Sequence, residues 1–427
     1  MPPSLRDWLP EGHLACFISD AIDSMDLSAF EARYGDEGPG NQAFDPRMMV
    51  KVLVYAYATG TFSSRKIAAK LHEDVAFRVL AADNFPAHRT ISDFRQRHLP
   101  EFQELFVQLV RMAFEVGLVK LGTVAVDGSK VKAHASKHKA MTYDRMKREE
   151  QRLRREIREL MSRARKTDAQ EDKRYGKDRR GDELPEELAR REDRLAKIQA
   201  ARKRLEARQA EEDRGKGREP GDQDRKGKPG KPFKRRFGEP AERAQENFTD
   251  PDSRIMKCGS SGFEQCYNAQ IAVDEGEQII VATEVTQSGS DVDQLIPVLE
   301  QVEANTGTRP KRTLADAGYR SESNFVELEK RGIEGFVALG REKDGTAKTS
   351  APSLEATGRM ARKMKTQRAR EHYRKRKYLG EPPFAWIKSV IGFRHFSVRG
   401  LAKVSNEWTL ACLAANLRRL HGKLAWV

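Results

Sequence analysis

Residues 123–132, TVAVDGSKVK, open the part of the chain that decides the fold. The first five, Thr123-Val-Ala-Val-Asp127, have the pattern of a buried strand that ends in a carboxylate. Far downstream, residues 266–273 and 278–286 are two β-rich runs separated by Asp-Glu-Gly-Glu, which predicts a β-hairpin. Residues 312–316 form another short strand pattern that ends in a carboxylate, Asp316.

Helix signals lie between and after these strands. Ser290-Asp-Val-Asp293 has the form of a capping box and opens an amphipathic helix that ends near Gly307. A helix around Phe325 and a strand at 335–339 follow, and Glu381-Pro-Pro-Phe predicts the start of a late helix at Glu381. The order β, insert, β, β, α, β, α, β predicts an α/β fold with an RNase H-like mixed sheet.

Three acids stand where such a fold would bring carboxylates together, namely Asp127, Asp316 and Glu381. Mg²⁺ is a hard cation that prefers oxygen ligands. Two such ions about 4 Å apart can activate the attacking oxygen and stabilise the leaving oxygen of a phosphoryl transfer. The pattern therefore predicts a site for two Mg²⁺ ions, with Mn²⁺ as a substitute, and Lys388 lies two helical turns beyond Glu381, where it could contact a DNA phosphate.

The charge of the chain points to a polyanionic partner. Its 427 residues carry 79 Lys and Arg against 64 Asp and Glu, a net charge of +15, so nucleic acid is the first candidate. Residues 141–240 alone hold 33 basic and 23 acidic residues, which accounts for +10 of that charge. This composition predicts a solvated insert without a core, with helices at 142–162 and 184–210 that could pair as a hairpin, and a flexible arm at 211–238. The alternative is a DNA-gripping element.

Composition also limits the compartment. No stretch approaches the roughly 20 apolar residues of a membrane span, and the first residues lack the features of a secretory signal. The four cysteines are scattered, which indicates a reducing cytoplasm. We therefore expect a cytoplasmic, nucleoid-associated protein with no membrane partner.

Two further regions carry basic residues in places suited to DNA. Residues 1–118 are predicted to form short helices that resemble a helix-turn-helix module, although three-helix modules also serve as plain scaffolds. Residues 359–377 contain ten basic residues and one acid, Glu371, which favours phosphate contact over a merely solvated face. The candidate DNA-binding residues are Arg65, Lys66, Arg89, Arg95, Arg97, Lys130, Lys132, Arg374, Lys377, Lys388 and Arg399.

The sequence resembles the DDE transposases of bacterial insertion sequences along most of its length outside the insert. The matching segments are FDPRMMVKVLVYAYATGTFSSRKIA, PAHRTISDFRQRH, VAVDGSKVKAHAS, FTDPDSRIMK, CYNAQIAVDE, LADAGYRSESNF and EPPFAWIKSVIGFRHFSVRG. The resemblance implies that Asp127, Asp316 and Glu381 are the catalytic metal ligands. It also implies a homo-oligomer on paired DNA ends.

One motif departs from the family. Its members often have Tyr, two residues, Arg, three residues, Glu, six residues, Lys, and only Glu381 and Lys388 fit that spacing. The Tyr position is Arg374, next to Tyr373, and the Arg position is Lys377, which lacks the planar fork of arginine. Glu371 is the main competitor for the third acid.

Other polar residues have plainer interpretations. Asp252, Asp274, Asp291 and Asp293 are expected at turns or caps, and Phe384 and Trp386 in the core, with base stacking as the alternative for one of them. Asn268 and Gln270 could equally be buried strand residues bound to the backbone or residues with a role in the site. A zinc site from His134, His138, Cys258 and Cys266 is weakly supported because no Cys-x2-Cys pair is present.

These observations predict a helical DNA-binding domain at 1–120 and a catalytic domain at 121–427 interrupted by a charged insert at 141–245. The predicted function is a Mg²⁺-dependent transposase that acts on the terminal inverted repeats of its element and on target double-stranded DNA, without a nucleotide cofactor. The rivals are a nuclease or resolvase of the same fold that never joins DNA, and a non-catalytic DNA-binding protein derived from a transposase.

Overall fold

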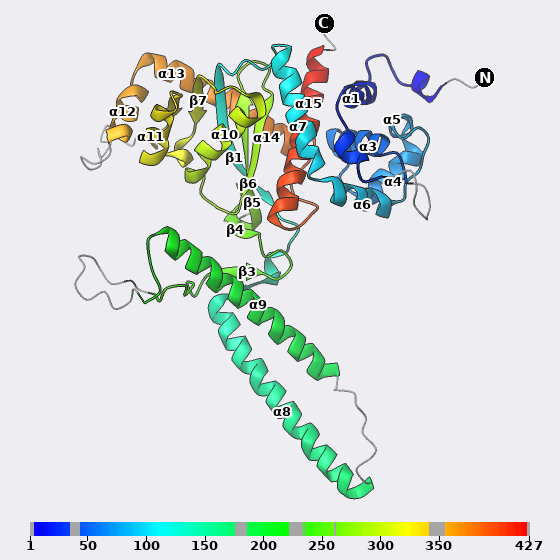
Figure 1. Ribbon diagram of the computed structural model, residues 1–427, viewed down its shortest axis with the longest axis vertical. Coiled ribbons are helices and arrows are strands. Elements are labelled where there is room, and N and C mark those ends of the chain that lie inside the picture. The colour runs from blue at the N-terminus through cyan, green and yellow to red at the C-terminus, as the bar shows by residue number, and fades with distance from the viewer. Residues whose placement is uncertain are drawn as a thin grey trace. The chain divides into compact units, whose positions relative to one another are not determined.

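A computed structural model describes residues 4–34, 43–175, 186–221, 233, 235–259, 262–340 and 355–424 (Figure 1). The chain divides into two compact units, which we describe separately. The first contains Met1–His134 and Met256–Val427, and the second contains Ala135–Ile255. Among the described residues, no helix is both long and apolar enough to cross a membrane.

The first unit begins with helices. Asp45 caps α3 by accepting a hydrogen bond from the Arg47 amide at 2.7 Å, and Pro46 takes the first helical position, where its missing N–H costs nothing. Nearly every later side chain of α3 is buried, so the other helices pack around it. The helical elements of this region are η1 (Leu5–Trp8), α1 (Leu14–Asp23), α2 (Ser28–Glu31), α3 (Pro46–Ala58), α4 (Ser64–Glu73), α5 (Val75–Leu80), α6 (His88–His98) and α7 (Glu101–Glu115).

A six-stranded mixed sheet follows. The strand β5 pairs antiparallel with β1 on one edge and with β6 on the other, where β4 also pairs, while β7 and β8 continue parallel beyond β1. This order, β6-β5-β1-β7-β8, confirms the expected RNase H-like mixed sheet behind a helical N-terminal region. The strands are β1 (Thr123–Lys132), β4 (Arg254–Lys257), β5 (Phe263–Asp274), β6 (Ile280–Thr286), β7 (Arg312–Ala315) and β8 (Glu334–Val337).

Helices cover the sheet, as Figure 1 shows. Leu379 of α14 and Ala369 of α13 pack on Ala125, Leu314 and Phe336 of the central strands. The helical elements of this part are η5 (Val292–Gln294), α10 (Leu295–Thr306), η6 (Ala317–Tyr319), α11 (Glu322–Lys330), α12 (Glu355–Met364), α13 (Gln367–Arg374), α14 (Arg376–Ala385), η7 (Trp386–Val390) and α15 (Leu401–Leu424).

The start predicted for the late helix is wrong. The helix α14 begins at Arg376 rather than at Glu381, and it contains both Pro382 and Pro383. The buried contacts of Leu379 stabilise the first turn ahead of the prolines, so tertiary packing outweighs the preference of proline for a helix start. Glu381 consequently lies inside the helix and not at its N-terminus, so the helix dipole does not favour its negative charge.

The last helix, α15, connects the N-terminal helices to the sheet. It packs against α3, α7 and β6. The carboxylate of its fully buried Glu407 accepts a hydrogen bond from the Tyr57 hydroxyl at 2.7 Å, and its Asn416 pairs with both backbone groups of Ile280. The N-terminal helices therefore share one interior with the sheet.

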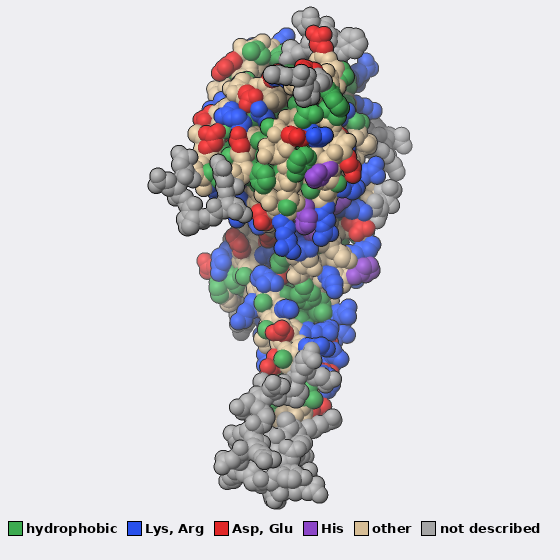
Figure 2. All heavy atoms as spheres, turned by 90° about the vertical axis from the view of Figure 1, so that its right-hand side faces the viewer, with side chains coloured by type: hydrophobic (Ala, Val, Ile, Leu, Met, Phe, Trp, Pro, Cys, Tyr) green, Lys and Arg blue, Asp and Glu red, His purple; other side chains and the backbone are tan. Residues whose placement is uncertain are grey.

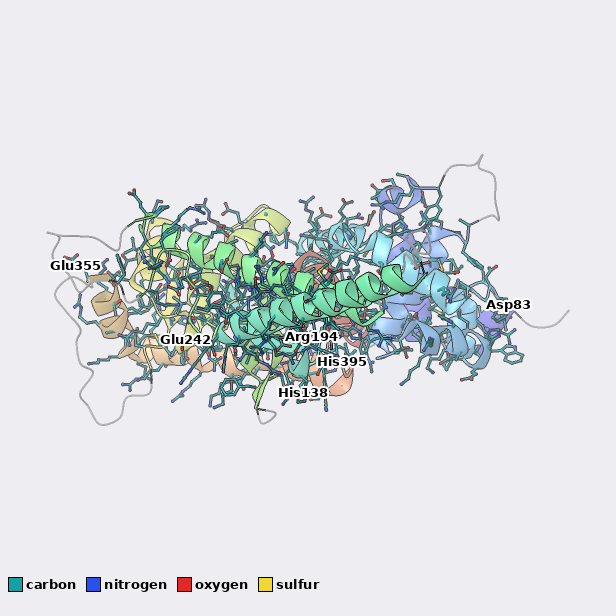
Figure 3. The ribbon with its side chains drawn as sticks, turned by 90° about the horizontal axis from the view of Figure 1, so that it is seen from below. Asp83, His138, Arg194, Glu242, Glu355 and His395 are labelled. Atoms are coloured by element: carbon teal, nitrogen blue, oxygen red, sulfur yellow. The ribbon has the colours of Figure 1, made fainter. Side chains whose placement is uncertain are left out.

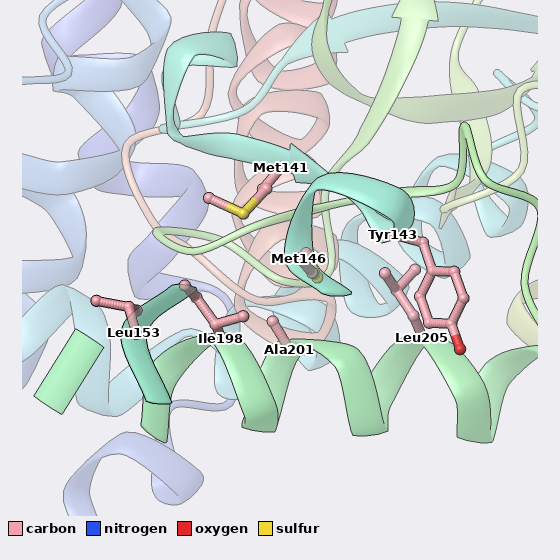
Figure 4. Close-up of a cluster of buried hydrophobic side chains, with 7 residues drawn as sticks. All are labelled: Met141, Tyr143, Met146, Leu153, Ile198, Ala201 and Leu205. Carbon is pink, nitrogen blue, oxygen red and sulfur yellow. The ribbon is translucent and has the colours of Figure 1, made fainter. Parts of the chain in front are cut away.

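The second unit is the charged insert, and the expectation that it has no core is wrong. The long helices α8 (Tyr143–Tyr175) and α9 (Glu186–Gly215) pair as a hairpin, and the short strands β2 (Ala140–Thr142) and β3 (Gln245–Asn247) pair antiparallel beside η2 (Lys137–Lys139). A small apolar core lies between them, as Figure 4 shows. It contains Met141, Tyr143, Met146, Leu153, Ile198, Ala201 and Leu205.

Ion pairs neutralise much of the charge of this unit. The buried carboxylate of Glu246 contacts Arg204 at 2.6 Å and Arg208 at 2.7 Å, and Arg194, labelled in Figure 3, contacts Glu149 at 3.1 Å. Sparse apolar side chains every three to four residues are enough to form a core when the charged neighbours pair with each other. Part of the expected flexible arm, at 222–232 and 234, lies outside the described residues.

Candidate active site

Asp127 and Asp316 lie side by side on neighbouring strands. Parallel pairing sets Ala125 of β1 opposite Leu314 of β7, so the same register carries Asp127 opposite Asp316, just beyond the end of β7. The Asp127 Oδ1 atom accepts a hydrogen bond from the Gly128 amide at 2.9 Å. The Asp316 Oδ1 atom accepts one from the Gly318 amide at 2.7 Å and thereby caps η6.

The pKa of Asp127 reflects its burial and the charged groups around it. Burial raises the pKa of this carboxyl to about 6, the Gly128 amide and Arg376 lower it, and the negative charges of Asp316 and Glu381 raise it. All three acids therefore act on one small region, and burial disfavours the charged form of Asp127 even with Arg376 nearby.

The third acid is arranged differently. Glu381 is largely exposed, and its Oε1 atom contacts Arg376 Nη2 at 3.2 Å. The residue before it, Gly380, lies directly on Asp127, because a Cβ atom added there would stand 3.1 Å from Asp127 Cβ. The backbone of α14 therefore touches the first acid, while the Glu381 side chain extends from the helix to the guanidinium.

Arg376 is the cation among the three acids. Burial lowers its pKa, but the neighbouring Tyr373, Asp127, Asp316 and Glu381 raise it, and the net effect is a raised pKa. Its guanidinium carbon lies 5.9 Å from the centre of the Tyr373 ring.

The motif residues expected from strict spacing, Arg374 and Lys377, are both exposed, and neither occupies the place of the motif. Tyr373 and Arg376 occupy it instead. Two residues separate Tyr373 from Arg376, as in the motif, but four residues rather than three separate Arg376 from Glu381. Counting back from Glu381 therefore missed them by one position, and the Tyr-x2-Arg spacing is the signal that could have found them.

Lys388 is partly buried near the end of β1. Its Nζ donates to Ser129 Oγ at 2.5 Å and to the Lys130 carbonyl at 2.8 Å, and burial lowers its pKa. The side chain thus lies beside the strand that carries Asp127, and it belongs to η7, which directly follows the helix that carries Glu381.

A polar network lies behind the aspartates, and sequence reasoning missed its centre. Asp291 was expected at a turn or cap, and it does stand at the N-cap position of η5, but its side chain makes no cap hydrogen bond. Its Oδ1 accepts instead from Asn268 Nδ2 at 2.6 Å, Gln270 Nε2 at 2.8 Å and Lys130 Nζ at 3.1 Å. Asn268 and Gln270 are therefore bound to the side chains of the site and not to backbone alone. The alternating Asn-x-Gln on a buried strand was the available signal.

Comparison with known proteins gives two family matches. Residues 240–417 match the model of the transposase DDE domain, and residues 3–97 match that of a transposase domain (DUF772). The chain belongs to the DDE transposases. No curated protein and no solved structure matches it.

In the transposase, the candidate DNA-binding residues of the N-terminal helices fall into two groups. Arg65, Lys66, Arg89 and Arg97 are exposed on α4 and α6. Arg95 is buried, with Nη1 donating to the Phe62 carbonyl at 2.7 Å and to the Tyr57 hydroxyl at 3.4 Å. A DNA contact by Arg95 does not fit this position, because the guanidinium is used inside the helical core.

Three further basic candidates have protein partners. Lys130 pairs with Asp291 at 3.1 Å, Lys132 with Glu264 at 3.7 Å, and Arg399 Nε donates to the His134 carbonyl at 3.0 Å. Several members of the basic run also pair with acids, for example Arg359 with Glu329 and Arg368 with Glu334. Figure 2 nevertheless shows many Lys and Arg side chains on the face that it presents.

Transposases of this type use divalent metal ions. Within the described part of the chain, no three Asp, Glu, His or Cys side chains are grouped closely enough to hold a metal as they stand. The weak zinc candidate of His134, His138, Cys258 and Cys266 therefore gains no support. Asp127 and Asp316 fit such an ion by their oxygen donors and by the raised pKa of Asp127, which a cation would lower. Glu381 fits only after it leaves Arg376.

The aromatic candidates differ from each other. Phe384 is buried and stacks on Trp408 with ring centres 5.7 Å apart, so it belongs to the core. Trp386 is partly exposed and lies under the Arg418 guanidinium at 5.2 Å.

Proposed function

We propose that this transposase cuts DNA at the terminal inverted repeats of its element and joins the freed 3′ end to target DNA, with Asp127, Asp316 and Glu381 as catalytic acids. The observation that carries the proposal is the parallel register of β1 and β7, which sets Asp127 beside Asp316, together with Arg376 and Glu381 at the same point. A Mg²⁺ pair, or Mn²⁺ in its place, would activate the attacking oxygen and stabilise the leaving one.

The residues of the chain would divide the work. Asp127 and Asp316 would hold the metal ions, with Glu381 as the third ligand. The Arg376 guanidinium offers the planar, bidentate donor set that suits a phosphate, and a DNA phosphate would compete with Glu381 for it. Lys388 lies close enough to β1 to hold a second phosphate near the aspartates.

The N-terminal part, residues 1–120, would bind the element ends through the exposed Arg65, Lys66, Arg89 and Arg97. Phosphate contacts of this kind position a protein on DNA, whereas base contacts select the sequence. Pairing of two ends requires two copies of the site, so the active form would be a homo-oligomer on DNA at the nucleoid.

A strand-transfer assay tests the function. The full-length protein is mixed with a pre-cut end of its element, a supercoiled target and Mg²⁺, and joined products are separated from cleaved ones. Joined product that disappears in Asp127→Asn and Asp316→Asn supports the proposal. Cleavage without joining would favour the nuclease, and binding without either reaction would favour the non-catalytic DNA-binding protein.

A further inference from the structure

Gln270 lies on β5, the strand next to the one that carries Asp127. It is fully buried in β5 and pairs in register with Gly128, the residue after Asp127. A Cβ atom added at Gly128 would collide with Gln270 Nε2 and stand 2.9 Å from Asp291 Oδ1. A side chain at residue 128 would therefore displace the carboxamide, and the missing Cβ of Gly128 leaves the space that the Gln270 side chain fills.

Both ends of the Gln270 carboxamide are occupied. Its Nε2 donates to Asp291 Oδ1 at 2.8 Å and to Asn268 Oδ1 at 3.0 Å, and its Oε1 accepts a hydrogen bond from the Tyr319 hydroxyl. Because the hydroxyl donates at one end and two oxygens accept at the other, the amide has a single satisfied orientation. A buried network of this kind is rigid when all of its members are satisfied.

Tyr319 connects the Gln270 carboxamide to the turn that follows Asp316. It is the last residue of the turn η6, which Asp316 caps, and its ring is fully buried. A Cβ atom added at Gly318, in the middle of the turn, would stand 2.9 Å from Asp316 Oδ1 and 3.3 Å from Asp291 Oδ2. The turn therefore fits between the aspartate that it carries and the Asp291 carboxylate that anchors Gln270.

We propose that Gln270 is a positioning residue for the Asp127–Asp316 pair: with Asn268, Asp291 and Tyr319, it fixes the distance between β1 and the turn at Asp316, and so sets the affinity of the two aspartates for a divalent cation. The inference rests on the proposed function of that pair. Gln270 touches neither DNA nor metal, and acts only through Gly128 on one side and Tyr319 on the other. Loss of such outer contacts typically weakens metal binding by about 10–100-fold.

The test measures Mn²⁺ binding to the full-length protein without DNA, and the electron paramagnetic resonance signal of free Mn²⁺ reports how much is bound. The melting temperature of each variant is measured without metal. Tyr319→Phe removes only the hydroxyl that anchors the turn, and we expect its half-saturating Mn²⁺ concentration to rise about tenfold. Gln270→Met keeps the volume and removes both ends of the network, and it should show at least the same rise.

Tyr57→Phe is the matched control, because it also deletes a buried tyrosine hydroxyl, here the one bound to Glu407. It should lower the melting temperature and leave Mn²⁺ binding unchanged. If either Tyr319→Phe or Gln270→Met folds and binds Mn²⁺ as the wild type does, while Asp127→Asn does not bind, the positioning role is wrong and the proposed site stands. If Asp127→Asn also binds as the wild type does, the metal site itself is wrong and the positioning role falls with it.

Discussion

The acids on strands and the acid on a helix meet in one place but are held in opposite ways. Asp127 and Asp316 are held by strand register and by backbone amides, and the proposed positioning residue Gln270 pairs in register with Gly128, next to Asp127. Glu381 extends from α14, is largely exposed and is held by a single cation, Arg376. In the proposed metal site, the strand pair would be in place before a metal binds, whereas the helix acid would have to leave Arg376 first. The third acid is the adjustable part of the site.

The largest expected effect concerns the strand pair. Asp127→Asn and Asp316→Asn should each lower DNA cleavage by at least about 10³-fold, because residues that act as a unit fail together. Cleavage with Mg²⁺ and with Mn²⁺ on an end-containing duplex measures this loss. The double variant should lose no more cleavage activity than either single variant. If the two losses add up instead, the two aspartates do not act as a unit.

A smaller loss is expected for the helix acid. Glu381→Gln should lower cleavage by about 100-fold, because it removes a ligand that is not yet in place in the free protein. Glu371→Gln provides the control, since Glu371 is exposed on α13 and accepts a hydrogen bond from Gln367. It should stay within about twofold of the wild type. A loss as large as that of Asp127→Asn would show that Glu381 is as firmly placed as the strand pair.

Acid should weaken metal binding at the strand pair. The pKa of Asp127 is about 6, and a protonated carboxyl cannot serve as a ligand. Below pH 6 the apparent Mn²⁺ affinity should fall by about tenfold per pH unit, and it should level off above that pH. Arg376→Gln removes a charge that lowers this pKa, so it should move the midpoint to higher pH. A midpoint that stays near pH 4 in the wild type would contradict the burial of Asp127.

The smallest expected effect is on stability. A folded pKa of about 6 against the usual 3.8 means that ionised Asp127 destabilises the fold, and this cost is absent below pH 4, grows between pH 4 and 6 and is complete above pH 6. At pH 7.5 and without metal, Asp127→Asn should therefore stabilise the protein by about 2 kcal/mol.

Glu381→Gln should change the stability by less than about 0.5 kcal/mol, since the side chain is exposed. Urea unfolding of both variants checks the difference. Equal effects, or a destabilised Asp127→Asn, would remove the contrast between the two kinds of acid.

The strand acids could be predicted because a buried strand leaves a short and distinctive pattern. Asp127 and Asp316 each end such a pattern, and parallel register does the rest. The surroundings of Glu381 could not be predicted, since α14 starts five residues before it through the packing of Leu379. The chain has one more residue between Arg376 and Glu381 than the motif has. Counting back from Glu381 therefore gave Lys377 and Arg374 in place of Arg376 and Tyr373.

Two other failures have a common cause. Arg95 was expected on DNA and lies in the helical core, and the insert was expected without a core and has one between α8 and α9. In both places, charged groups are satisfied by partners that are distant in the sequence or one helix away. The amino-acid composition gives the number of charged side chains but not which groups they pair with in the folded chain.

The closing helix α15 has a consequence for the order of events during synthesis. Tyr57 and Glu407 bond across 350 residues of sequence, and the helix that carries Glu407 packs on α3, α7 and β6. Contacts this distant in sequence make folding slow, and here they form only after residues up to Glu407 have left the ribosome. A chain cut short before α15 would leave the first helices without the surface that buries them, so a frameshift ahead of Leu401 should disrupt the first unit as a whole and not just this helix.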